Sequence, residues 1–369
     1  MTPPLWHDRL HHAAELRQAA LAAVNPAEAV RRHLMREEDA IVAGGERVPL
    51  APGARAFVVG AGKAGVAMAE AARAILGPRL IGGCLSVPRL PDRDLAPLQF
   101  IRGGHPVPDD GTLAAGRRIA EILAETRPDD VVVALISGGG SALLELPLAG
   151  ITLADLQATT HALLRCGATI VELNCVRKSL SQIKGGGLAR MAAPARVIGL
   201  ILSDVVGDPL DVIASAPTLP ESASPADALS VFERYGIAES IPPSIINSLR
   251  QSVFNRQSIR NPQSPITNRI IGSNTLAALA AVERAASLGF NSLLLSTFVE
   301  GEAREVGRVV AGLAKGIRRY NQPFAPRAGL VLGGETTVTI RGDGVGGRNQ
   351  ELALAAAIAL EGWERVMVM

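Results

Sequence analysis

The stretch that decides the fold is residues 131–141, VVVALISGGGS, in which an unbroken apolar run leads into three glycines between two serines. Residues 131–136 predict a strand that is apolar on both faces, and such strands belong to parallel sheets covered on both sides by helices. Consecutive glycines let several backbone N–H groups point into one concavity and form an anion-binding nest. The stretch therefore predicts a phosphate or nucleotide site formed by Ser137, Gly138, Gly139, Gly140 and Ser141.

On both sides of this strand, short apolar runs alternate with segments of helical periodicity. The first forty residues read as helix, and they are followed by strands at 57–59, 80–87 and 197–202 and by helices at 64–76, 112–126, 153–165 and 171–184. Alternation of this kind is typical of a doubly wound α/β layer with a mostly parallel sheet.

A polar, proline-containing stretch at residues 254–268 interrupts this alternation. Strands are then expected at 269–271, 292–296, 329–332, 336–340 and 366–369, and helices at 273–288, 302–320 and 348–360. We therefore expect an N-terminal α/β domain over 1–253, a linker over 254–268 and a second α/β domain over 269–369.

Composition excludes several classes of protein. Thirty-seven basic against thirty-five acidic residues give a net charge of +2, and aromatic residues are only 3%, so a nucleic-acid binder is not expected. The longest nearly uncharged stretch, 131–144, is too short to span a membrane. Three cysteines without CxxC spacing argue against a disulfide framework or a zinc site and favour a cytoplasmic protein.

The sequence GAGKAG at 60–65 follows a strand and opens a helix, so it formally matches the dinucleotide motif GxGxxG. That motif also needs an acidic residue at the end of the next strand, where this chain has Ser86 and Val87. Lys63 follows Gly62 and is one of only four lysines among the 37 basic residues. We therefore expect that its ammonium group binds an anion at the start of the helix.

Two further segments of the first domain carry charged groups. NCVRKSLSQIKGGG at 174–187 places Arg177 and Lys184 seven residues apart on one helix face. With Asn174 they suit a substrate carboxylate or a phosphate, although a solvated helix face fits the pattern equally well. Asp204 and Asp208 follow a buried strand, where carboxylates hold Mg²⁺ or act as a base, an N-cap or Asx turn being the alternative.

The second domain has two glycine-rich segments of its own. Gly334, Glu335 and Thr336 follow one expected strand, and GVGGRNQE at 344–351 feeds a helix that begins with Arg348 and Asn349. An arginine presented from a glycine loop at a helix N-terminus suits anion binding or transition-state charge. Together with the first domain, these residues match the needs of phosphoryl transfer.

These segments resemble, in order from about residue 55 to residue 369, the bacterial glycerate 2-kinases with a C-terminal MOFRL domain. The strings that carry the resemblance are GAGKAG at Gly60, GGHPVPD at Gly103, ISGGGSALL at Ile136, VRKSLSQIKGGGLA at Val176, SDVVGD at Ser203, RIIGSN at Arg269, EGEAREVGR at Glu300 and GGETTVTIRGDGVGGRNQELALA at Gly333.

The resemblance implies ATP-dependent phosphorylation of D-glycerate to 2-phosphoglycerate, with Mg²⁺ and with two Rossmann-like lobes around a cleft. It also implies that Lys63 and Arg348 are the catalytic lysine and arginine and face each other across that cleft. Asp204 is our candidate for the catalytic carboxylate. We expect a monomer or homodimer whose partner is the small-molecule substrate.

The chain departs from the family pattern at several positions. Ser179 stands where the family usually has His, Gly187 where it has Arg, Ser215-Ala216-Pro217 where it has SGP, and Glu221-Ser222 where it has Asp-Pro. The family also continues beyond the position of Met369 with a Thr-Asp-Gly segment. Two alternatives therefore remain open: an NAD(P)H-dependent hydroxypyruvate reductase, suggested by GxGxxG, and a truncated family member that binds nucleotide without turnover.

Overall fold

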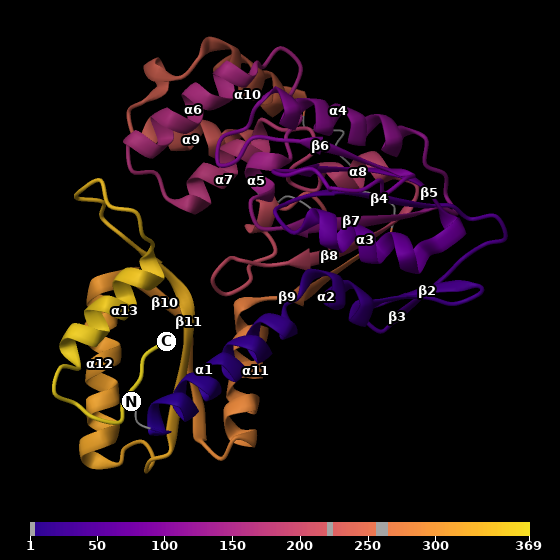
Figure 1. The fold of residues 1–369 in the computed structure, drawn as a ribbon. Coiled ribbons are helices and arrows are strands. Elements are labelled where there is room, and N and C mark those ends of the chain that lie inside the picture. The colour runs from indigo at the N-terminus through magenta and orange to yellow at the C-terminus, as the bar shows by residue number, and fades with distance from the viewer. Residues whose placement is uncertain (1–3, 220–223, 256–264) are drawn as a thin grey trace. The chain divides into compact units, whose positions relative to one another are not determined.

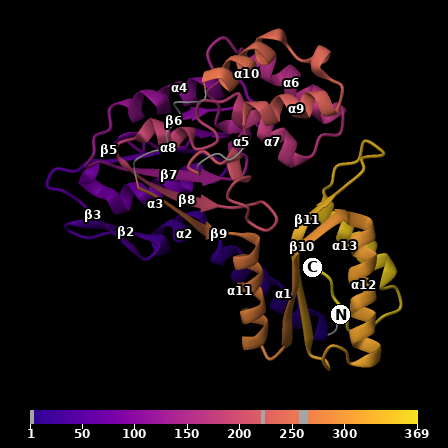
Figure 2. The same cartoon turned by 180° about the vertical axis from the view of Figure 1, so that it is seen from behind.

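The computed structural model of the chain describes residues 4–219, 224–255 and 265–369. The chain forms two compact units. Residues 26–271 form one, which we call the large unit, and the described residues up to Asn25 join residues 272–369 in the other, the terminal unit. Each unit has its own sheet and helices (Figures 1 and 2), which confirms the α/β fold class.

The large unit is built on a six-stranded sheet of order β6-β5-β4-β7-β8-β9. Neighbouring strands from β6 to β8 pair in parallel. From β4 the chain adds β5 and β6 on one side and β7 and β8 on the other, so the strand order reverses between β4 and β7, and ligands bind beyond the carboxyl ends at such a point. The strands are β4 (Ala56–Ala61), β5 (Leu80–Val87), β6 (Leu98–Arg102), β7 (Val131–Ser137), β8 (Arg196–Leu202) and β9 (Ile266–Gly272).

Alternate residues of the central strands enter two separate cores, as the apolar run at 131–136 predicts. Val58 and Val133 pack on one face with α2 (Pro26–His33) and α3 (Gly65–Leu76). Val59 and Val132 pack on the other face with α4 (Asp110–Ala124) and α8 (Gly187–Ala192). Because both faces are covered, every residue of β7 is buried.

A third apolar core of the large unit lies among four helices beside the sheet (Figure 1). It contains Leu163, Leu173 and Phe232, each at most 3% exposed. The helices are α6 (Leu153–Arg165), α7 (Ile170–Ser179), α9 (Pro225–Arg234) and α10 (Pro243–Asn255).

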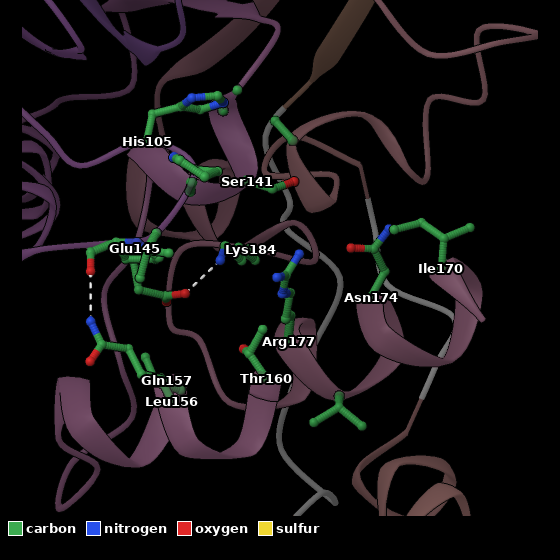
Figure 3. A pocket seen from close by; sticks show the side chains of 18 of the residues that line it. His105, Ser141, Glu145, Leu156, Gln157, Thr160, Ile170, Asn174, Arg177 and Lys184 are labelled. Atoms are coloured by element: carbon green, nitrogen blue, oxygen red, sulfur yellow. Dashed lines mark hydrogen bonds and ion pairs between the residues drawn. The ribbon is translucent and has the colours of Figure 1, made fainter. Parts of the chain in front are cut away.

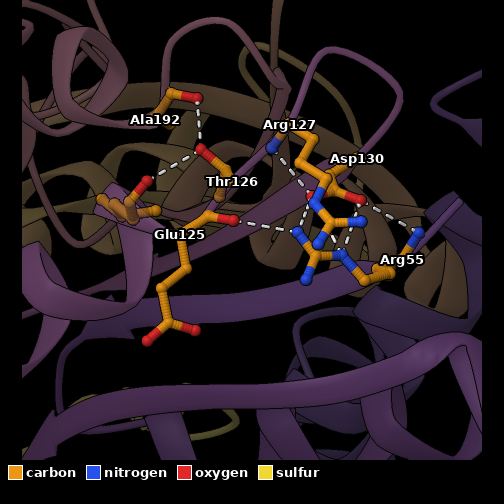
Figure 4. Close-up of polar contacts among 7 residues, drawn as sticks. Arg55, Glu125, Thr126, Arg127, Asp130 and Ala192 are labelled. Carbon is orange, nitrogen blue, oxygen red and sulfur yellow. Dashed lines mark hydrogen bonds and ion pairs between the residues drawn. The ribbon is translucent and has the colours of Figure 1, made fainter.

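Arg55 and Asp130 join the starts of β4 and β7 (Figure 4). Nη2 of Arg55 lies 2.6 Å from Oδ2 of Asp130, and Nε lies 3.1 Å from Oδ1. The backbone N–H groups of Arg55 and Arg127 donate to the same carboxylate. Asp130 is only 2% exposed. This buried ion pair therefore holds β4 and β7 together at their amino-terminal ends, away from the carboxyl ends of the strands.

The terminal unit contains a two-stranded parallel sheet, β10 (Asn291–Glu302) and β11 (Ala328–Thr337). Its helices are α1 (Pro4–Ala23), α11 (Asn274–Ser287), α12 (Ala303–Tyr320) and α13 (Arg348–Ala359). The expected helices at 273–288, 302–320 and 348–360 are thus confirmed to within two residues. The strands expected at 329–332 and 336–340 are a single strand, and residues 366–369 form no strand.

The compact units differ from the expected domains 1–253 and 269–369. Helix α1 belongs to the terminal unit, where the His12 ring contacts Phe290 edge-on and Glu15 pairs with Arg284 at 3.0 Å. The strand expected to open the second domain is part of β9, in the large sheet. Most of the expected linker, residues 256–264, lies outside the described residues.

The helical expectation for the first forty residues is wrong beyond His33. Residues 34–49 form a small antiparallel sheet of β1 (Leu34–Arg36), β2 (Ala40–Ala43) and β3 (Glu46–Pro49). Gly44 and Gly45 join β2 to β3 with φ of 57° and 89°, and two positive φ angles are what a tight hairpin turn requires. None of the helices that the structure describes is long and apolar enough to span a membrane.

Candidate functional site

Two glycine-rich loops interlock where the strand order reverses. The backbone N–H of Lys63, after β4, donates to the carbonyl of Gly138, after β7, across 2.9 Å. The N–H of Ala64 donates to Oγ of Ser137 at 3.1 Å. A Cβ at Gly62, whose φ is +140°, would lie 2.1 Å from that Oγ. Glycine is therefore required for the two loops to come this close.

Three side chains approach the loop 137–141 because its glycines leave room for them. A Cβ at Gly139 would lie 3.4 Å from Cε of Lys63 and 2.8 Å from Cδ2 of His105. A Cβ at Gly138 would lie 2.0 Å from Oδ2 of Asp204. Gly139 has φ +83° and precedes α5 (Gly140–Leu143), and a left-handed residue followed by helical ones is a nest geometry.

His105 is a site residue that the sequence reasoning missed. Its loop follows β6 and is held by Asp109, whose Oδ1 accepts from the N–H of Gly104 at 2.8 Å and from that of Thr112 at 2.9 Å. Burial lowers the pKa of His105, the charge of Lys63 lowers it further, and Asp204 acts in the opposite direction. Its place after a strand of the central sheet is the signal that could have identified it.

A cavity of about 860 Å³ opens beside the glycine loop (Figure 3). It is lined by that loop, by the segment 105–108, by residues of α6 and α7, and by Asp204 and Val205. Arg177, Asn174, Lys184 and Glu145 lie in its polar part, and apolar side chains such as Leu156 and Ile170 line the rest. All of these residues belong to the large unit.

Lys184 and Glu145 form a buried ion pair at this cavity (Figure 3). Nζ of Lys184 lies 2.5 Å from Oε2 of Glu145, and the two side chains are 2% and 4% exposed. Burial lowers the pKa of Lys184, and Glu145 opposes that change. Lys184, predicted to bind phosphate, is thus already paired with a carboxylate of the chain, and Glu145 was not among the predicted residues.

The helix expected over 171–184 ends at Ser179, so Arg177 and Lys184 do not share a helix face. Lys184 lies in the turn between α7 and α8, where the N–H groups of Gly185 and Gly186 donate to the carbonyls of Ser215 and Ala216. The helix ends early because residues 180–182 instead pair with residues 146–148, and Gly185 and Gly186, with φ of 52° and 75°, then lead the chain into α8. The turn nonetheless brings Lys184 to the same cavity as Arg177.

Helix α7 presents Arg177 and Asn174 to the cavity. Thr169 caps the helix in a capping box with Glu172, and Ile170, Asn174 and Arg177 then follow at spacings of four and three on one face. Burial lowers the pKa of Arg177, while the charge of Glu145 raises it. Among the described residues no carboxylate pairs with this guanidinium, which leaves it available to an anion.

A hydrogen-bonded chain connects Asn174 with the glycine loop. Oγ of Ser215 lies 3.2 Å from Oδ1 of Asn174 and 3.1 Å from Oγ of Ser141. Ser215 is fully buried, and Ala214, Ser215 and Ala216 have φ of 51°, 60° and 55°. Three consecutive left-handed residues without a glycine are strained by about 1–3 kcal/mol each, and such strain is typical of functional sites.

The two predicted metal-binding carboxylates differ in position. Asp204 is exposed and lines the cavity, whereas Asp208 is not among its lining residues. Oδ1 of Asp208 is buried and has no hydrogen-bond partner among the described atoms. In the part of the chain that the structure describes, no three His, Cys, Asp or Glu side chains form a metal-binding group. Mg²⁺ needs only one or two carboxylates when phosphate oxygens and water complete its shell, so a site for it does not require a larger carboxylate cluster.

The terminal unit brings its own predicted residues together. Nη1 of Arg348, the first residue of α13, lies 2.6 Å from Oε1 of Glu335 and 3.0 Å from the carbonyl of Thr336. Gly334 has φ +152°, and a Cβ there would lie 2.0 Å from the Val299 carbonyl. Asn349 is exposed beside Arg348. The predicted residues therefore form two groups, one in each unit; Glu221 and Ser222 lie outside the described residues.

Comparisons with known proteins agree with the motifs. Residues 12–250 match the model described as "Domain of unknown function (DUF4147)", and residues 328–369 match the MOFRL family. The D-glycerate 2-kinase of Thermotoga maritima is 42% identical over 317 residues, which are 85% of this chain and 74% of that protein. The glycerate 2-kinase of Pyrococcus horikoshii is 37% identical over 95% of this chain and 79% of its own length.

The fold has a solved counterpart. The crystal structure of the glycerate kinase from Thermotoga maritima matches with a TM-score of 0.84 and 38% identity, covering 97% of this chain and 81% of that one. The resemblance inferred from the motifs is thereby confirmed.

Proposed function

This chain belongs to the glycerate 2-kinase family, and we propose that it transfers the γ-phosphoryl group of ATP to the 2-hydroxyl group of D-glycerate. One observation carries the proposal: Lys63, His105 and Asp204 converge on a glycine loop next to a cavity that contains an unpaired arginine. Phosphoryl transfer depends mainly on positioning and on charges that stabilise the transferring oxygens, and this arrangement supplies both.

The interlocked loops are the proposed phosphate site. Backbone N–H groups of Gly138, Gly139 and Gly140 would face the phosphate oxygens, as in other glycine-rich anion nests. Lys63 lies against Gly139, where its ammonium group would neutralise charge on the transferring phosphoryl group. The bond between the substrate oxygen and the γ-phosphorus forms while the bond from that phosphorus to the β–γ bridging oxygen breaks, and ADP leaves.

Arg177 is the proposed anchor for the carboxylate of D-glycerate. A guanidinium binds a carboxylate through two parallel hydrogen bonds, and burial strengthens that attraction. Asn174 and Ser141, linked through Ser215, would then receive the hydroxyl groups. The substrate would thereby lie with its 2-hydroxyl toward the glycine loop.

Asp204 is the proposed acceptor of the hydroxyl proton, because its carboxylate lies against Gly138 and lines the cavity. Asp204 and Asp208 would also be the protein ligands of Mg²⁺, and the unpartnered Oδ1 of Asp208 supports this assignment. When bound, the metal would neutralise part of the charge on the phosphate oxygens.

Arg348 is the proposed second catalytic cation. Its side chain is 49% exposed although it pairs with Glu335, so it can exchange that carboxylate for phosphate oxygens. Its partners Glu335 and Thr336, together with Gly334 and Asn349, are the proposed nucleotide contacts of the terminal unit. We further propose a cytoplasmic enzyme whose partner is its small-molecule substrate, acting as a monomer or homodimer.

The test is ³¹P NMR of the protein with ATP, Mg²⁺ and D-glycerate. We expect ADP to appear together with a phosphate ester on the 2-carbon. A parallel assay that follows NADH absorbance with hydroxypyruvate tests the reductase alternative. That alternative is disfavoured because β5 does not end in the acidic residue that would bind the ribose of NAD. ATP binding without any phosphoglycerate would favour the non-catalytic alternative and contradict the proposal.

A further inference from the structure

We propose that Glu145 is a specificity-determining residue, which neutralises Lys184 so that the polar part of the cavity accepts an acid with one carboxylate and disfavours a dicarboxylate. The inference deepens the proposed function and depends on it, since it concerns how the same cavity distinguishes D-glycerate from related acids. Nothing in the motifs pointed to Glu145, which lies two residues after the end of α5.

The contacts of Glu145 hold its carboxylate in a fixed position at the cavity wall. Oε2 accepts from Nζ of Lys184 at 2.5 Å, and Oε1 accepts from the N–H of Leu146 at 3.0 Å. Both carboxylate oxygens are thus held by the chain, and the residue is 3% exposed. A carboxylate held so firmly keeps its orientation when a ligand enters.

Charges in this part of the cavity sum to one positive charge. Arg177 and Lys184 are both cations there, and they repel each other while Glu145 attracts both. Glu145 is bonded to Lys184, so Arg177 remains as the cation available to a substrate. Opposite charges in a largely buried site attract strongly and like charges repel. The single net positive charge therefore matches a ligand with one carboxylate and does not match a ligand with two.

Stability gives no reason for the pair. Replacing a buried ion pair by apolar side chains of similar volume is often neutral or stabilising. A lone Lys184 would instead leave two cations facing the ligand, which suits a dianion. The presence of Glu145 beside Lys184, at a cavity wall that also carries Arg177, is what a monocarboxylate site needs.

The experiment compares D-glycerate with tartronate, in which a second carboxylate replaces the hydroxymethyl group. Calorimetry gives the dissociation constant of each ligand for the full chain and its variants. In Glu145→Gln, we expect the preference for D-glycerate over tartronate to fall about tenfold or more, because two cations then face the ligand. In Lys184→Met, we expect the preference for D-glycerate over tartronate to rise. Glu145 then has no lysine partner, and its carboxylate repels the dianion more than the monoanion.

Two controls separate a charge effect from a structural one. The double variant Glu145→Gln/Lys184→Met restores one net positive charge, so its preference should return close to that of the parent chain. Glu121→Gln removes a carboxylate on α4 whose side chain is 63% exposed and should leave the preference unchanged. A purely structural role would weaken both ligands equally in each variant.

The outcomes also separate this inference from the proposed function. If the parent chain binds D-glycerate but neither single variant changes the ratio of the two dissociation constants, the specificity role of Glu145 is refuted and the kinase assignment stands. If the parent chain binds neither acid, both fail together.

Discussion

The amide nitrogen of Lys63 donates to the carbonyl oxygen of Gly138 across 2.9 Å. This bond joins the loop after β4 to the loop after β7 and so fixes the position of the lysine backbone relative to the glycine nest. The side chain of Lys63 then has a defined place beside Gly139.

Replacing Lys63 by Ala should lower kcat by about 100-fold, since one preorganised charge contributes roughly 3 kcal/mol to transition-state stabilisation. Lys63→Arg should fail as well, because a planar guanidinium does not replace the compact ammonium charge beside Gly139. Steady-state kinetics with ATP and D-glycerate measures both, and Lys315→Ala in α12 is the control. Near-normal turnover in Lys63→Ala would remove the lysine from the mechanism.

Arg348→Ala should also lower kcat by about 100-fold if its charge acts on the transferring group. The variant Lys63→Ala/Arg348→Ala should lose much less than the product of the two single losses if the two cations act as one unit, because the effects of such residues are not additive. Arg319→Ala, an exposed arginine near the end of α12, is the control. Strictly multiplicative losses would mean that the two cations contribute independently of each other.

Gly138→Ala should reduce activity about as much as Asp204→Asn, because the added methyl group would lie 2.0 Å from Oδ2 of Asp204. Gly138 is not among the positive-φ glycines, so backbone strain is not expected and the melting temperature should change little. Kinetics and thermal unfolding of Gly138→Ala are compared with those of Gly82→Ala, where nothing lies within 4 Å of the new Cβ. A fully active Gly138→Ala would contradict the assigned role of Asp204.

Ser215→Ala should lower kcat/KM by about 10- to 100-fold, since misplacing a substrate-positioning group by 1 Å has an effect of that size. Alanine and serine have similar strain in the left-handed region, so the variant removes only the hydroxyl group that joins Asn174 to Ser141. The unfolding free energy should fall by only about 1 kcal/mol. Ser230→Ala, on the exposed side of α9, is the control, and an equal loss of activity there would argue against the positioning role.

Asp130→Asn should destabilise the chain by about 3 kcal/mol at neutral pH, because it leaves Arg55 without its buried partner. Burial acts to raise the pKa of Asp130, but hydrogen bonds from Arg55 and Arg127 and the charge of Arg55 hold it below its usual range. The stabilisation is therefore present above about pH 4 and is lost as the pH falls through the lowered pKa.

Denaturant unfolding at several pH values measures this effect. The difference between the parent chain and Asp130→Asn should be largest near neutral pH and should shrink below about pH 4. Asp129→Asn, the exposed neighbour, should change stability little at any pH. A difference that is constant down to low pH would show that the carboxylate charge does not contribute.

Periodicity predicts those elements whose packing partners are close in sequence. The strands at 80–87 and 197–202 and the helix at 153–165 are confirmed within a residue, because burial on two faces or on one stripe leaves a clear pattern. The hairpin at Ala40–Pro49 depends on the glycine conformations at its turn, and the early end of α7 depends on the pairing of residues 180–182 with residues 146–148. Periodicity reports neither. The place of α1 depends on α11, a partner far along the chain.

The candidate site also contains some residues that the sequence predicts and others that it does not. Glycine loops and strand ends predict where anions bind, and Lys63, Asp204 and Arg177 are found together in the large unit. Glu145 was missed because a single acid has no spacing signal, and His105 was missed because the strand before it, β6, was not predicted. Lys184 was identified as a cation, but only its distance to Glu145 shows that the chain already neutralises it.

The packing of α1 against α11 has a consequence for biosynthesis. The ribosome makes α1 first, but α11 begins only at Asn274, and at roughly 5–20 residues per second the wait lasts on the order of ten seconds or longer. During that interval the large unit is synthesised up to β9, and α1 has no docking partner. The terminal unit is therefore completed only after the large unit has been synthesised, when α11 meets a helix made about 250 residues earlier.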